Sequence, residues 1–359
     1  MIHPTHILLI KSHSMGIGDL LRSSAAWRAL KNRWPHAQLH LLMLSKHAGY
    51  ASETFIKAHH LLSSATFITV KTGAPGHKQT KLPFASILRA ATQQLTNTPI
   101  DLVIDCEPYG VKTSLLARKI AKGKRAVSVG IAQFPLRKYF YDLSAQSVAL
   151  YARAHKLLEP MDYTERDFVA LAALGIARDG IAIELELGTD GRAWQHGHAT
   201  SFDAAIVQVV LNIGCGTADA VGRRPALGAL VECMTTLYLN KPYQLHLSGA
   251  AFEAAVNQEF MTLLKQQLLK LGKQISVTDW AGQCTLTQLT GLISQAHLFV
   301  SSDSGPYHMG VGLGVPTLCW FNYDEPAAYH RHSHVAALVL PTPAMFTQAA
   351  LRLMGPSSD

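Results

Sequence analysis

Several features are scarce in this sequence of 359 residues, and each scarcity argues against a class of protein. The five cysteines are scattered without a C-x-x-C pair, which fits neither a disulfide framework nor the usual zinc patterns. No apolar run approaches the roughly 20 residues of a membrane-spanning helix, and the start lacks the basic and apolar regions of a signal peptide. We therefore expect free thiols and a cytoplasmic protein.

Acidic residues are scarce in the first half of the chain. Residues 1–180 hold 23 Lys and Arg against 11 Asp and Glu, whereas residues 181–359 hold 9 against 13. A basic half suits an anionic acceptor, a membrane surface or nucleic acid. The alternative is that its most basic stretch, residues 112–125, forms only a solvated helix and turn, and charge alone does not choose between these readings.

Histidine, by contrast, is frequent, with 18 residues. The spacing of His330, His332 and His334 would place three imidazoles on one face of a strand. No cysteine or carboxylate that could complete a metal site is evident nearby. We expect a solvated loop here and no metal.

Strand-like and helix-like segments alternate through the whole chain, as they do in βα units around parallel sheets. The apolar runs that we expect as strands are residues 7–10, 39–44, 65–70, 102–104, 126–129, 205–213, 243–247, 275–277, 298–300 and 315–320. The main helical segments are residues 20–34, 252–271 and 286–296. Because the length exceeds the roughly 100 to 200 residues of one domain, the pattern predicts an α/β protein with two similar domains.

The alternation of strand-like and helix-like segments is interrupted at residues 175–202, where glycines lie among polar residues and no helical or strand periodicity is sustained. We expect an interdomain linker in this interval. The predicted boundaries are an N-terminal domain at 1–180, a linker at 181–204, a C-terminal domain at 205–340 and a final helix or tail at 341–359. Two such domains would face a central cleft, with ligands at the carboxyl ends of their strands.

The turn after the strand at 298–300 reads SSDSGPYH over residues 301–308. Ser304 suits a helix N-cap, and Pro306 suits the first turn of that helix. Backbone amides and the positive end of the helix dipole would form an anion site for a diphosphate, with His308 as a further donor. The alternative is that Asp303 and Ser304 merely cap the helix.

The turn after the first strand reads SHSMGIGD over residues 12–19. Gly16 and Gly18 resemble the start of a dinucleotide-binding fingerprint, but its third glycine would fall at Leu21, which disfavours a nicotinamide enzyme. Asp19 could take the proton of an acceptor hydroxyl during glycosyl transfer with inversion. The alternative is a capping aspartate, which the helix dipole makes a weaker base.

A third turn, GCGT at residues 214–217, follows the strand that ends at Ile213. Arg223 and Arg224 come shortly after it, and arginine can grip phosphate oxygens in bidentate fashion. The segment suits a diphosphate, or it forms a surface loop with two solvated arginines.

These three turns, in this order and spacing, resemble glycosyltransferase family 9, the ADP-heptose:lipopolysaccharide heptosyltransferases. The resemblance runs from about residue 7 to residue 326. Its most specific parts are GIGDL at 16–20 with RAL at 28–30 and Pro35, and SDSGPYH at 302–308 with LGVP at 313–316. It implies a GT-B fold, with two Rossmann-like domains facing a central cleft, and inverting transfer in the cytoplasm without metal or cofactor.

The resemblance also implies roles for particular residues. Asp19 matches the catalytic base of the family. The residues expected to hold the acceptor are Ser14, Met15, Gly16, Gly18 and Arg22. The residues expected to hold the donor are Gly214, Gly216, Thr217, Arg223, Arg224, Gly249, Glu253, Asp303, Ser304, Gly305 and His308.

The implied partners are ADP-heptose as donor and an anionic glycolipid of the lipopolysaccharide core as acceptor. Peripheral contact with the inner membrane is also implied, and nucleic acid is not. The sequence departs from the family at Gly222, where a lysine is usual, and at Arg224, where a tryptophan is usual. Either Arg223 or Arg224 supplies the missing cation, or the chain is a sugar-nucleotide-binding protein that has lost catalysis.

Overall fold

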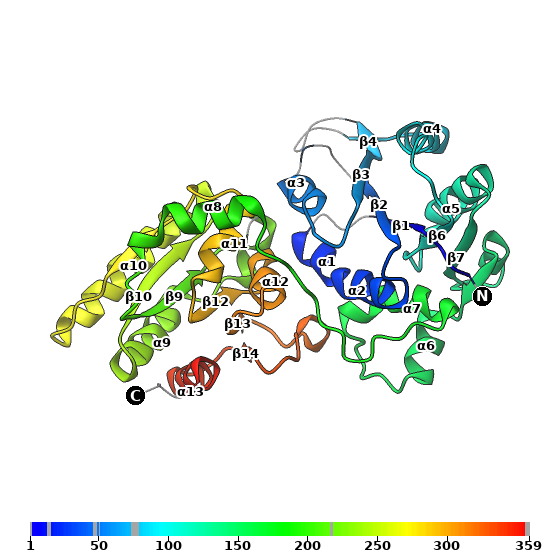
Figure 1. The fold of residues 1–359 in the computed structure, drawn as a ribbon. Helices are drawn as coiled ribbons and strands as arrows, with labels where there is room; N and C mark the ends of the chain where they lie inside the picture. Colours follow the sequence, from blue (N-terminus) through cyan, green and yellow to red (C-terminus); the bar gives the residue numbers. More distant parts are fainter. Residues whose placement is uncertain are drawn as a thin grey trace. The chain divides into compact units, whose positions relative to one another are not determined.

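The computed structural model describes residues 2–12, 16–45, 49, 51–72, 79–215 and 218–355, apart from the side chains of 51 and 218–220. The chain divides into two compact units, Met1–Ile183 and Glu184–Asp359. Each unit contains a six-stranded sheet with helices packed on it (Figure 1), and every strand pair in the two sheets is parallel. The predicted α/β class with two similar domains is confirmed. No helix within the described ranges is long and apolar enough to cross a membrane.

The N-terminal unit is built on a sheet with the strand order β3-β2-β1-β6-β7-β8, and a small hairpin pairs β4 with β5. Its strands are β1 His6–Ser12, β2 Gln38–Ser45, β3 Ser64–Thr69, β4 Lys71–Thr72, β5 Thr80–Lys81, β6 Leu102–Asp105, β7 Val127–Ile131 and β8 Leu143–Ala145. Its α-helices are α1 Ile17–Arg22, α2 Ser24–Arg33, α3 Ala51–Lys57, α4 Phe84–Gln94, α5 Val111–Lys124, α6 Val148–Ala154 and α7 Arg166–Leu171. Its 3-10 helices are η1 Arg137–Phe140, η2 Tyr163–Glu165 and η3 Ala172–Leu174.

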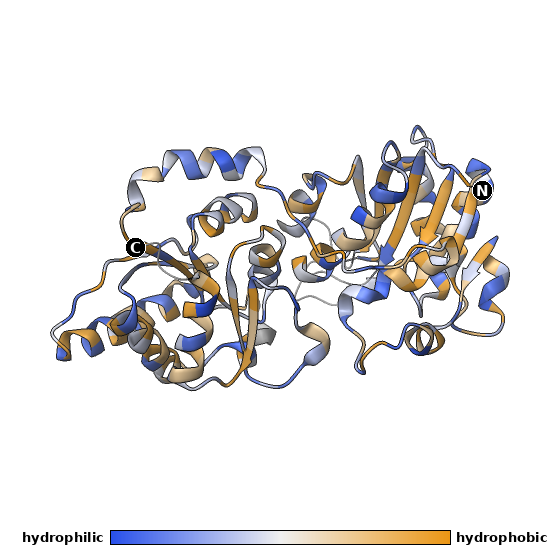
Figure 2. Cartoon of the chain, turned by 60° about the horizontal axis from the view of Figure 1, so that its bottom comes forward, coloured by the Kyte–Doolittle hydropathy of each residue, from blue (hydrophilic) through white to orange (hydrophobic). Residues whose placement is uncertain are grey.

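Strand β1 lies in the middle of this sheet because its residues are apolar on both faces. Its residues from Ile7 to Ile10 are at most 1% exposed, as expected for a parallel strand that helices cover on both sides. Leu8 and Ile10 belong to a core cluster with Ile87 of α4 and Leu116 of α5. Figure 2 shows the strands of this sheet as hydrophobic segments.

The C-terminal unit repeats the architecture, with the strand order β11-β10-β9-β12-β13-β14. Its strands are β9 Val207–Asn212, β10 Tyr243–Ser248, β11 Val277–Asp279, β12 Leu298–Ser302, β13 Thr317–Phe321 and β14 Val335–Val339. Its α-helices are α8 Thr189–Gly197, α9 Leu227–Asn240, α10 Ala254–Lys270, α11 Leu286–Ser294, α12 Gly305–Gly312 and α13 Pro343–Met354. Its 3-10 helices are η4 Ala199–Ser201, η5 Ala218–Arg223, η6 Ala251–Glu253 and η7 Pro326–Ala328.

The interval expected as a linker contains helix α8, which packs against α11. The contact depends on glycine, because a Cβ atom on Gly291 would lie 2.3 Å from the carbonyl oxygen of Gly191. The two backbones therefore approach more closely than side chains would allow. Gly191, which interrupts the sequence pattern here, therefore serves helix packing.

The C-terminal helix α13 is part of the C-terminal unit. Phe346 and Ala350 are fully buried in the same core cluster as Leu230 of α9 and Leu318 of β13. A helix with side chains of this size in the core contributes to folding. Residues 343–354 therefore complete the second unit.

Candidate functional site

The order of strands reverses once in each sheet, between β1 and β6 in the N-terminal unit and between β9 and β12 in the C-terminal unit. At such a reversal, the loops that follow the two neighbouring strands lead towards opposite edges of the sheet. This opens a crevice at the carboxyl ends of the two strands, where open α/β sheets bind ligands. These two crevices are therefore the candidate ligand-binding sites.

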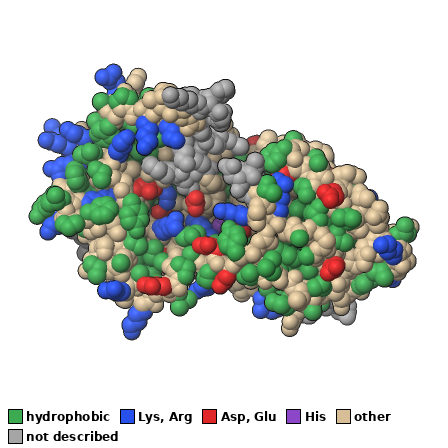
Figure 3. Space-filling view, turned by 180° about the vertical axis from the view of Figure 1, so that it is seen from behind, with side chains coloured by type: hydrophobic (Ala, Val, Ile, Leu, Met, Phe, Trp, Pro, Cys, Tyr) green, Lys and Arg blue, Asp and Glu red, His purple; other side chains and the backbone are tan. Residues whose placement is uncertain are grey.

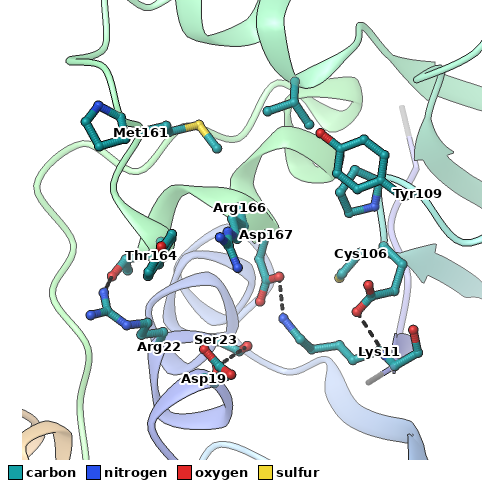
Figure 4. Close-up of a pocket in the computed structure, with 16 residues that line it drawn as sticks. Lys11, Asp19, Arg22, Ser23, Cys106, Tyr109, Met161, Thr164, Arg166 and Asp167 are labelled. Atoms are coloured by element: carbon teal, nitrogen blue, oxygen red, sulfur yellow. Dashed lines mark hydrogen bonds and ion pairs between the residues drawn. The ribbon is translucent and has the colours of Figure 1, made fainter. Parts of the chain in front are cut away.

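A cavity of about 590 Å³ opens at the crevice of the N-terminal unit (Figure 4). The charged side chains that line it come from β1, α1, α7 and the loop after β6. They are Lys11, Asp19, Arg22, Glu107, Arg166 and Asp167. Three cations and three carboxylates thus line this cavity, so it suits a polar ligand that carries both hydroxyl and acidic groups.

Lys11 and Asp167 form a buried ion pair at the base of the cavity. The Nζ atom of Lys11 lies 2.5 Å from Oδ1 of Asp167, and the two residues are 9% and 4% exposed. Burial by itself would lower the pKa of Lys11, but the charges of Asp167 and Glu107 outweigh it and raise the pKa above its ordinary value. Lys11 is therefore charged at neutral pH, and the pair fixes α7 against the end of β1.

Asp19 lies in the first turn of α1, and its side chain is exposed in the cavity. The N-cap position of this helix is Gly16, so Asp19 is not the capping residue. A Cβ atom on Gly16 would stand 3.8 Å from Oδ2 of Asp19, which places the carboxylate beside that glycine. The geometry leaves an exposed carboxylate where an acceptor could approach it.

Arg22 and Gly18, which the sequence predicted as acceptor residues, are both buried. The Nη1 atom of Arg22 donates to Oγ1 of Thr164 at 3.1 Å and lies 3.3 Å from Oδ1 of Asp162. Arg22 thus fastens α1 to the segment around η2 while it lines the cavity. Arg166 is exposed on the same wall, with its guanidinium 3.9 Å from the ring centre of Tyr163.

The loop after β6 is held by Arg137, whose side chain is buried beneath it. Arg137 donates to the carbonyl oxygens of Glu107, Pro108 and Gly110. Its Nη2 atom also pairs with Oδ2 of Asp105 at 3.1 Å. Because burial disfavours the carboxylate, the pKa of Asp105 is raised to about 6, although Tyr141 and Arg137 oppose the rise. This network sets the shape of the cavity wall.

A second cavity, of about 430 Å³, lies at the same edge of the N-terminal sheet. Its apolar side chains include Leu44, Val70, Phe84 and Ile87. Three lysines, Lys71, Lys81 and Lys112, also line it. The combination suits an anionic ligand with an apolar part.

The crevice of the C-terminal unit holds the turns at residues 214 and 302–305. The carbonyl oxygen of Gly214 accepts hydrogen bonds from Nδ2 of Asn212 at 2.9 Å and from Oγ of Ser302 at 2.6 Å. Asn212 also donates to Oγ of Ser304 at 3.2 Å. Two turns that are far apart in sequence are therefore tied together at the ends of β9 and β12.

Ser304 occupies the N-cap position of α12, but its side chain makes no capping hydrogen bond. Its hydroxyl donates instead to the carbonyl oxygen of Ser302 at 3.3 Å. Gly305 is the first residue of α12, and Pro306 follows it. The side chain of Ser304 therefore does not occupy the first-turn amides that the sequence assigned to a diphosphate.

Both arginines near this crevice contact carboxylates. Nη1 of Arg223 lies 3.4 Å from Oδ2 of Asp303, and Nη2 of Arg224 lies 3.4 Å from Oε1 of Glu253. Arg223 is exposed and Arg224 is half-buried. Each of the two predicted cations is thus paired with a carboxylate of the same unit.

Glu253 is buried beside Gly214 and Gly249, two of the glycines predicted to contact the donor. A Cβ atom on Gly214 would lie 1.8 Å from Oε1 of Glu253, and one on Gly249 would lie 3.2 Å from its Oε2. Glu253 also accepts a hydrogen bond from the amide of Ala250 at 2.8 Å. Glycine at 214 is required for this carboxylate to reach the edge of the sheet.

His308, in the first half of α12, contacts a second buried histidine that the sequence did not connect with it. Nδ1 of His308 and Nε2 of His330 lie 2.8 Å apart, so one nitrogen donates and the other accepts. The expectation of a solvated loop is wrong for His330, which is 3% exposed, because this segment packs on α12 before β14 begins. The rings of His332 and His334 stack at 5.6 Å, and among the described residues no group of His, Cys, Asp or Glu is arranged to hold a metal.

Several predicted residues lie outside the described part of the chain. They are the acceptor residues Ser14 and Met15 and the donor residues Gly216 and Thr217. Sequence reasoning in turn missed Lys11, Glu107, Arg166 and Asp167 in the cavity. For Lys11 a signal existed, since a lysine directly after the buried run ILLI needs a partner that compensates its charge.

Part of the chain matches the sequence model of a known family. Residues 235–346 match the sequence model described as "Glycosyltransferase family 9 (heptosyltransferase)". The chain is also similar to "Lipopolysaccharide core heptosyltransferase OpsX" of Haemophilus influenzae, with 38% identity over 64 residues. That alignment spans 17% of this chain and only 18% of the length of OpsX.

Two solved structures share the fold over nearly the whole chain. The glycosyl transferase family 9 structure from Veillonella parvula has a TM-score of 0.66 at 16% identity and covers 94% of this chain and 87% of that one. The E. coli ADP-heptose lps heptosyltransferase II has a TM-score of 0.65 at 16% identity and covers 97% and 98%.

The two α/β units, each with one reversal of strand order in its parallel sheet, have the GT-B fold. Within that class, residues 235–346 are similar in sequence to glycosyltransferase family 9.

Proposed function

We propose that this chain is an inverting glycosyltransferase that moves heptose from ADP-heptose to an anionic glycolipid of the lipopolysaccharide core. The observation that carries the proposal is the Asp19 carboxylate, exposed in a cavity that Lys11, Arg22 and Arg166 also line. Cations around a carboxylate suit an acidic acceptor whose hydroxyl group must lose a proton. Such an acceptor would be met in the cytoplasm, at the inner face of the membrane.

The donor would bind at the crevice of the C-terminal unit. The start of α12 would supply backbone amides to the diphosphate, and the guanidinium groups of Arg223 and Arg224 would supply charge. Gly214 and Gly249 would let the nucleotide approach the sheet edge beside Glu253. The name of the E. coli structure with this fold, an ADP-heptose heptosyltransferase, agrees with an ADP-sugar.

The proposed reaction needs one base. The oxygen of the acceptor hydroxyl would attack the anomeric carbon of the donor sugar, and the bond from that carbon to the diphosphate oxygen would break. The proton of the hydroxyl would pass to the carboxylate of Asp19. ADP would leave with the bonding electrons, and its charge would be stabilised by the cations and amides of the donor crevice.

The test is the release of ADP from ADP-heptose with phosphorylated inner-core acceptors. In Asp19→Asn we expect kcat to fall about 10²- to 10⁴-fold, the usual contribution of a general base, with the affinity for ADP unchanged. Asp179→Asn replaces another exposed carboxylate of the same unit and should keep full activity. If the wild type binds ADP but releases none from ADP-heptose with any acceptor, the enzymatic proposal fails.

A sugar-nucleotide-binding protein without catalysis is the second candidate. The observation that favours it is that Arg223 and Arg224 already pair with Asp303 and Glu253, while Gly222 stands where the family has lysine. Gly222→Lys tests it, since a Cβ atom on Gly222 meets nothing within 4 Å.

Gly228→Lys is the matched control, because its Cβ atom is equally unobstructed. Turnover that appears only in Gly222→Lys would support the binding protein as the natural state. Turnover in the wild type that Gly222→Lys leaves unchanged would exclude it.

A further inference from the structure

Two segments of the N-terminal unit, residues 109–111 and 134–139, expose large apolar side chains. Leu136 is 73% exposed, Tyr109 65%, Tyr139 64%, Val111 56% and Phe134 46%. Among the described residues before Tyr109, no side chain of this kind is exposed. We call these five residues the apolar surface. Single exposed apolar residues are ordinary, but a group of them marks an interaction site.

The same part of the chain is strongly basic. Residues 108–141 contain eight Lys and Arg and no Asp or Glu. The exposed cations among them are Lys112, Arg118, Lys119, Lys122, Arg125 and Lys138. In Figure 3, Lys and Arg side chains gather with hydrophobic ones on the N-terminal unit, at the left of the view. The apolar surface is therefore part of a basic region.

A single buried side chain holds the two loops of the apolar surface together. Arg137 is 3% exposed, although its neighbour Leu136 is 73% exposed. Its guanidinium donates to carbonyl oxygens of residues 107, 108 and 110, and thus joins the loop of Leu136 to the loop of Tyr109. The rings of Tyr109 and Phe134 accordingly lie with their centres 6.4 Å apart.

The basic helix α5 is tied to this assembly as well. Arg118 of α5 donates to the carbonyl oxygen of Tyr139. Lys138 lies with its Nζ atom 5.1 Å from the ring centre of Tyr139, so a cation and an aromatic ring are presented side by side. The backbone that carries the apolar side chains is thus held in place by these contacts, which lowers the entropy lost on binding.

We propose that this surface docks the chain onto an anionic lipid bilayer. Aromatic rings with a polar edge settle at the level of lipid headgroups, aliphatic side chains enter the acyl boundary, and lysines attract anionic lipids. Nucleic acid would also attract the cations and stack on Tyr109 or Tyr139. The exposed aliphatic side chains of Leu136 and Val111 favour the bilayer, because they offer nucleic acid neither stacking nor hydrogen bonds.

The test is co-sedimentation of the full chain with vesicles of phosphatidylcholine, with and without phosphatidylglycerol. We expect binding to the anionic vesicles that weakens as salt is raised. Leu136→Ser should lower the partition coefficient about tenfold, since it removes one apolar side chain from the acyl boundary. Lys138→Gln should lower it about fivefold, the effect of one basic residue near an anionic surface.

Matched controls are available on α10 of the other unit. Leu269 is 65% exposed and Lys270 is also exposed, so Leu269→Ser and Lys270→Gln remove the same groups from a surface outside the proposed contact. They should leave vesicle binding unchanged. All four side chains are exposed, so circular dichroism should show folded protein in each variant.

Three results would overturn the proposal. The first is that the wild type fails to bind the anionic vesicles. The second is that the control variants lower vesicle binding as much as the surface variants do. The third is that the chain binds single-stranded nucleic acid and not vesicles. The measurement uses no sugar nucleotide and no acceptor. Its outcome is therefore independent of whether the chain is a glycosyltransferase.

Discussion

Lys11 and Asp167 are 156 residues apart in the chain, yet the Lys11 ammonium donates a 2.5 Å hydrogen bond to the Asp167 carboxylate in the interior. The pair joins the carboxyl end of the central strand β1 to the start of α7. Both residues also line the cavity in which Asp19 is exposed. This buried ion pair therefore holds the part of the cavity wall that α7 forms.

Breaking this pair should destabilise the fold. In Lys11→Met the Asp167 carboxylate stays buried without its cation, and the expected loss is about 3 to 5 kcal/mol in the free energy of unfolding. Urea denaturation followed by circular dichroism measures it. Lys119→Met, at an exposed position of α5, is the control and should change stability by less than about 0.5 kcal/mol. A loss below about 1 kcal/mol in Lys11→Met would contradict the prediction.

The buried His246 should make stability depend on pH. Burial lowers the pKa of His246 to about 4, and Trp280 Nε1 donates to its Nδ1 atom at 3.2 Å, so the neutral ring carries its proton on Nε2. The unfolded chain takes up a proton near pH 6.5, before the folded chain does. The contribution of the neutral His246 ring to the free energy of unfolding is therefore complete above pH 6.5. It is lost as the pH falls towards 4, and the loss amounts to up to about 3 kcal/mol.

Unfolding free energies measured between pH 4 and 7 check this prediction. The wild type should lose more stability on acidification than His246→Asn, which lacks the titrating group. His36→Asn removes an exposed histidine and should follow the wild-type curve. Parallel curves for the wild type and His246→Asn would show that burial of His246 does not govern the acid response.

The crossing of α8 and α11 should be intolerant of a methyl group. Gly291→Ala places a Cβ atom 2.3 Å from the carbonyl oxygen of Gly191, and backbone cannot move aside as a side chain would. We expect a loss of about 1 to 3 kcal/mol, typical of overpacking. In Gly197→Ala, on the partner helix α8, the new Cβ atom meets nothing within 4 Å, so this variant should be neutral or stabilising by up to about 1 kcal/mol. Thermal melts of the two variants should move apart, and coincident melts would contradict the assigned packing.

Gly214→Ala should weaken the binding of ADP if the C-terminal crevice holds the donor. The new Cβ atom would lie 1.8 Å from Oε1 of Glu253, and the carboxylate would have to leave the amide of Ala250. We expect the Kd for ADP to rise at least about tenfold, which corresponds to about 1.4 kcal/mol. Isothermal calorimetry measures it, with Gly222→Ala as the unobstructed control. Unchanged affinity in Gly214→Ala would place the nucleotide elsewhere.

The central strands were predictable from sequence because parallel strands covered on both faces are apolar throughout. The runs at 7–10 and 298–300 lie within β1 and β12. The edge strands β8 and β14 were missed. Leu143 and Ser144 of β8 are exposed, so no apolar pattern identifies that strand.

The site was predictable only where a local pattern defines it. The turns of Asp19 and Asp303 follow strands directly, and the topology brings each to the crevice of its own sheet. The partners of polar groups depend on tertiary packing. The position of Lys11 after a buried run indicates that it needs a partner, but the sequence does not identify that partner as Asp167, nor the partner of His308 as His330. The prediction that residues 20–34 form one helix also failed in detail, since α1 ends at Arg22 and α2 begins at Ser24.

The repeated strand order has a consequence for synthesis of the chain. All six strands of the first sheet, from β1 to β8, lie before residue 146, and no strand of this sheet is contributed by the second unit. The first unit can therefore complete its core while the second is still being translated, which at 5 to 20 residues per second takes roughly 10 to 35 seconds. Asp19 and the ion pair beneath it would then already be in place on the ribosome.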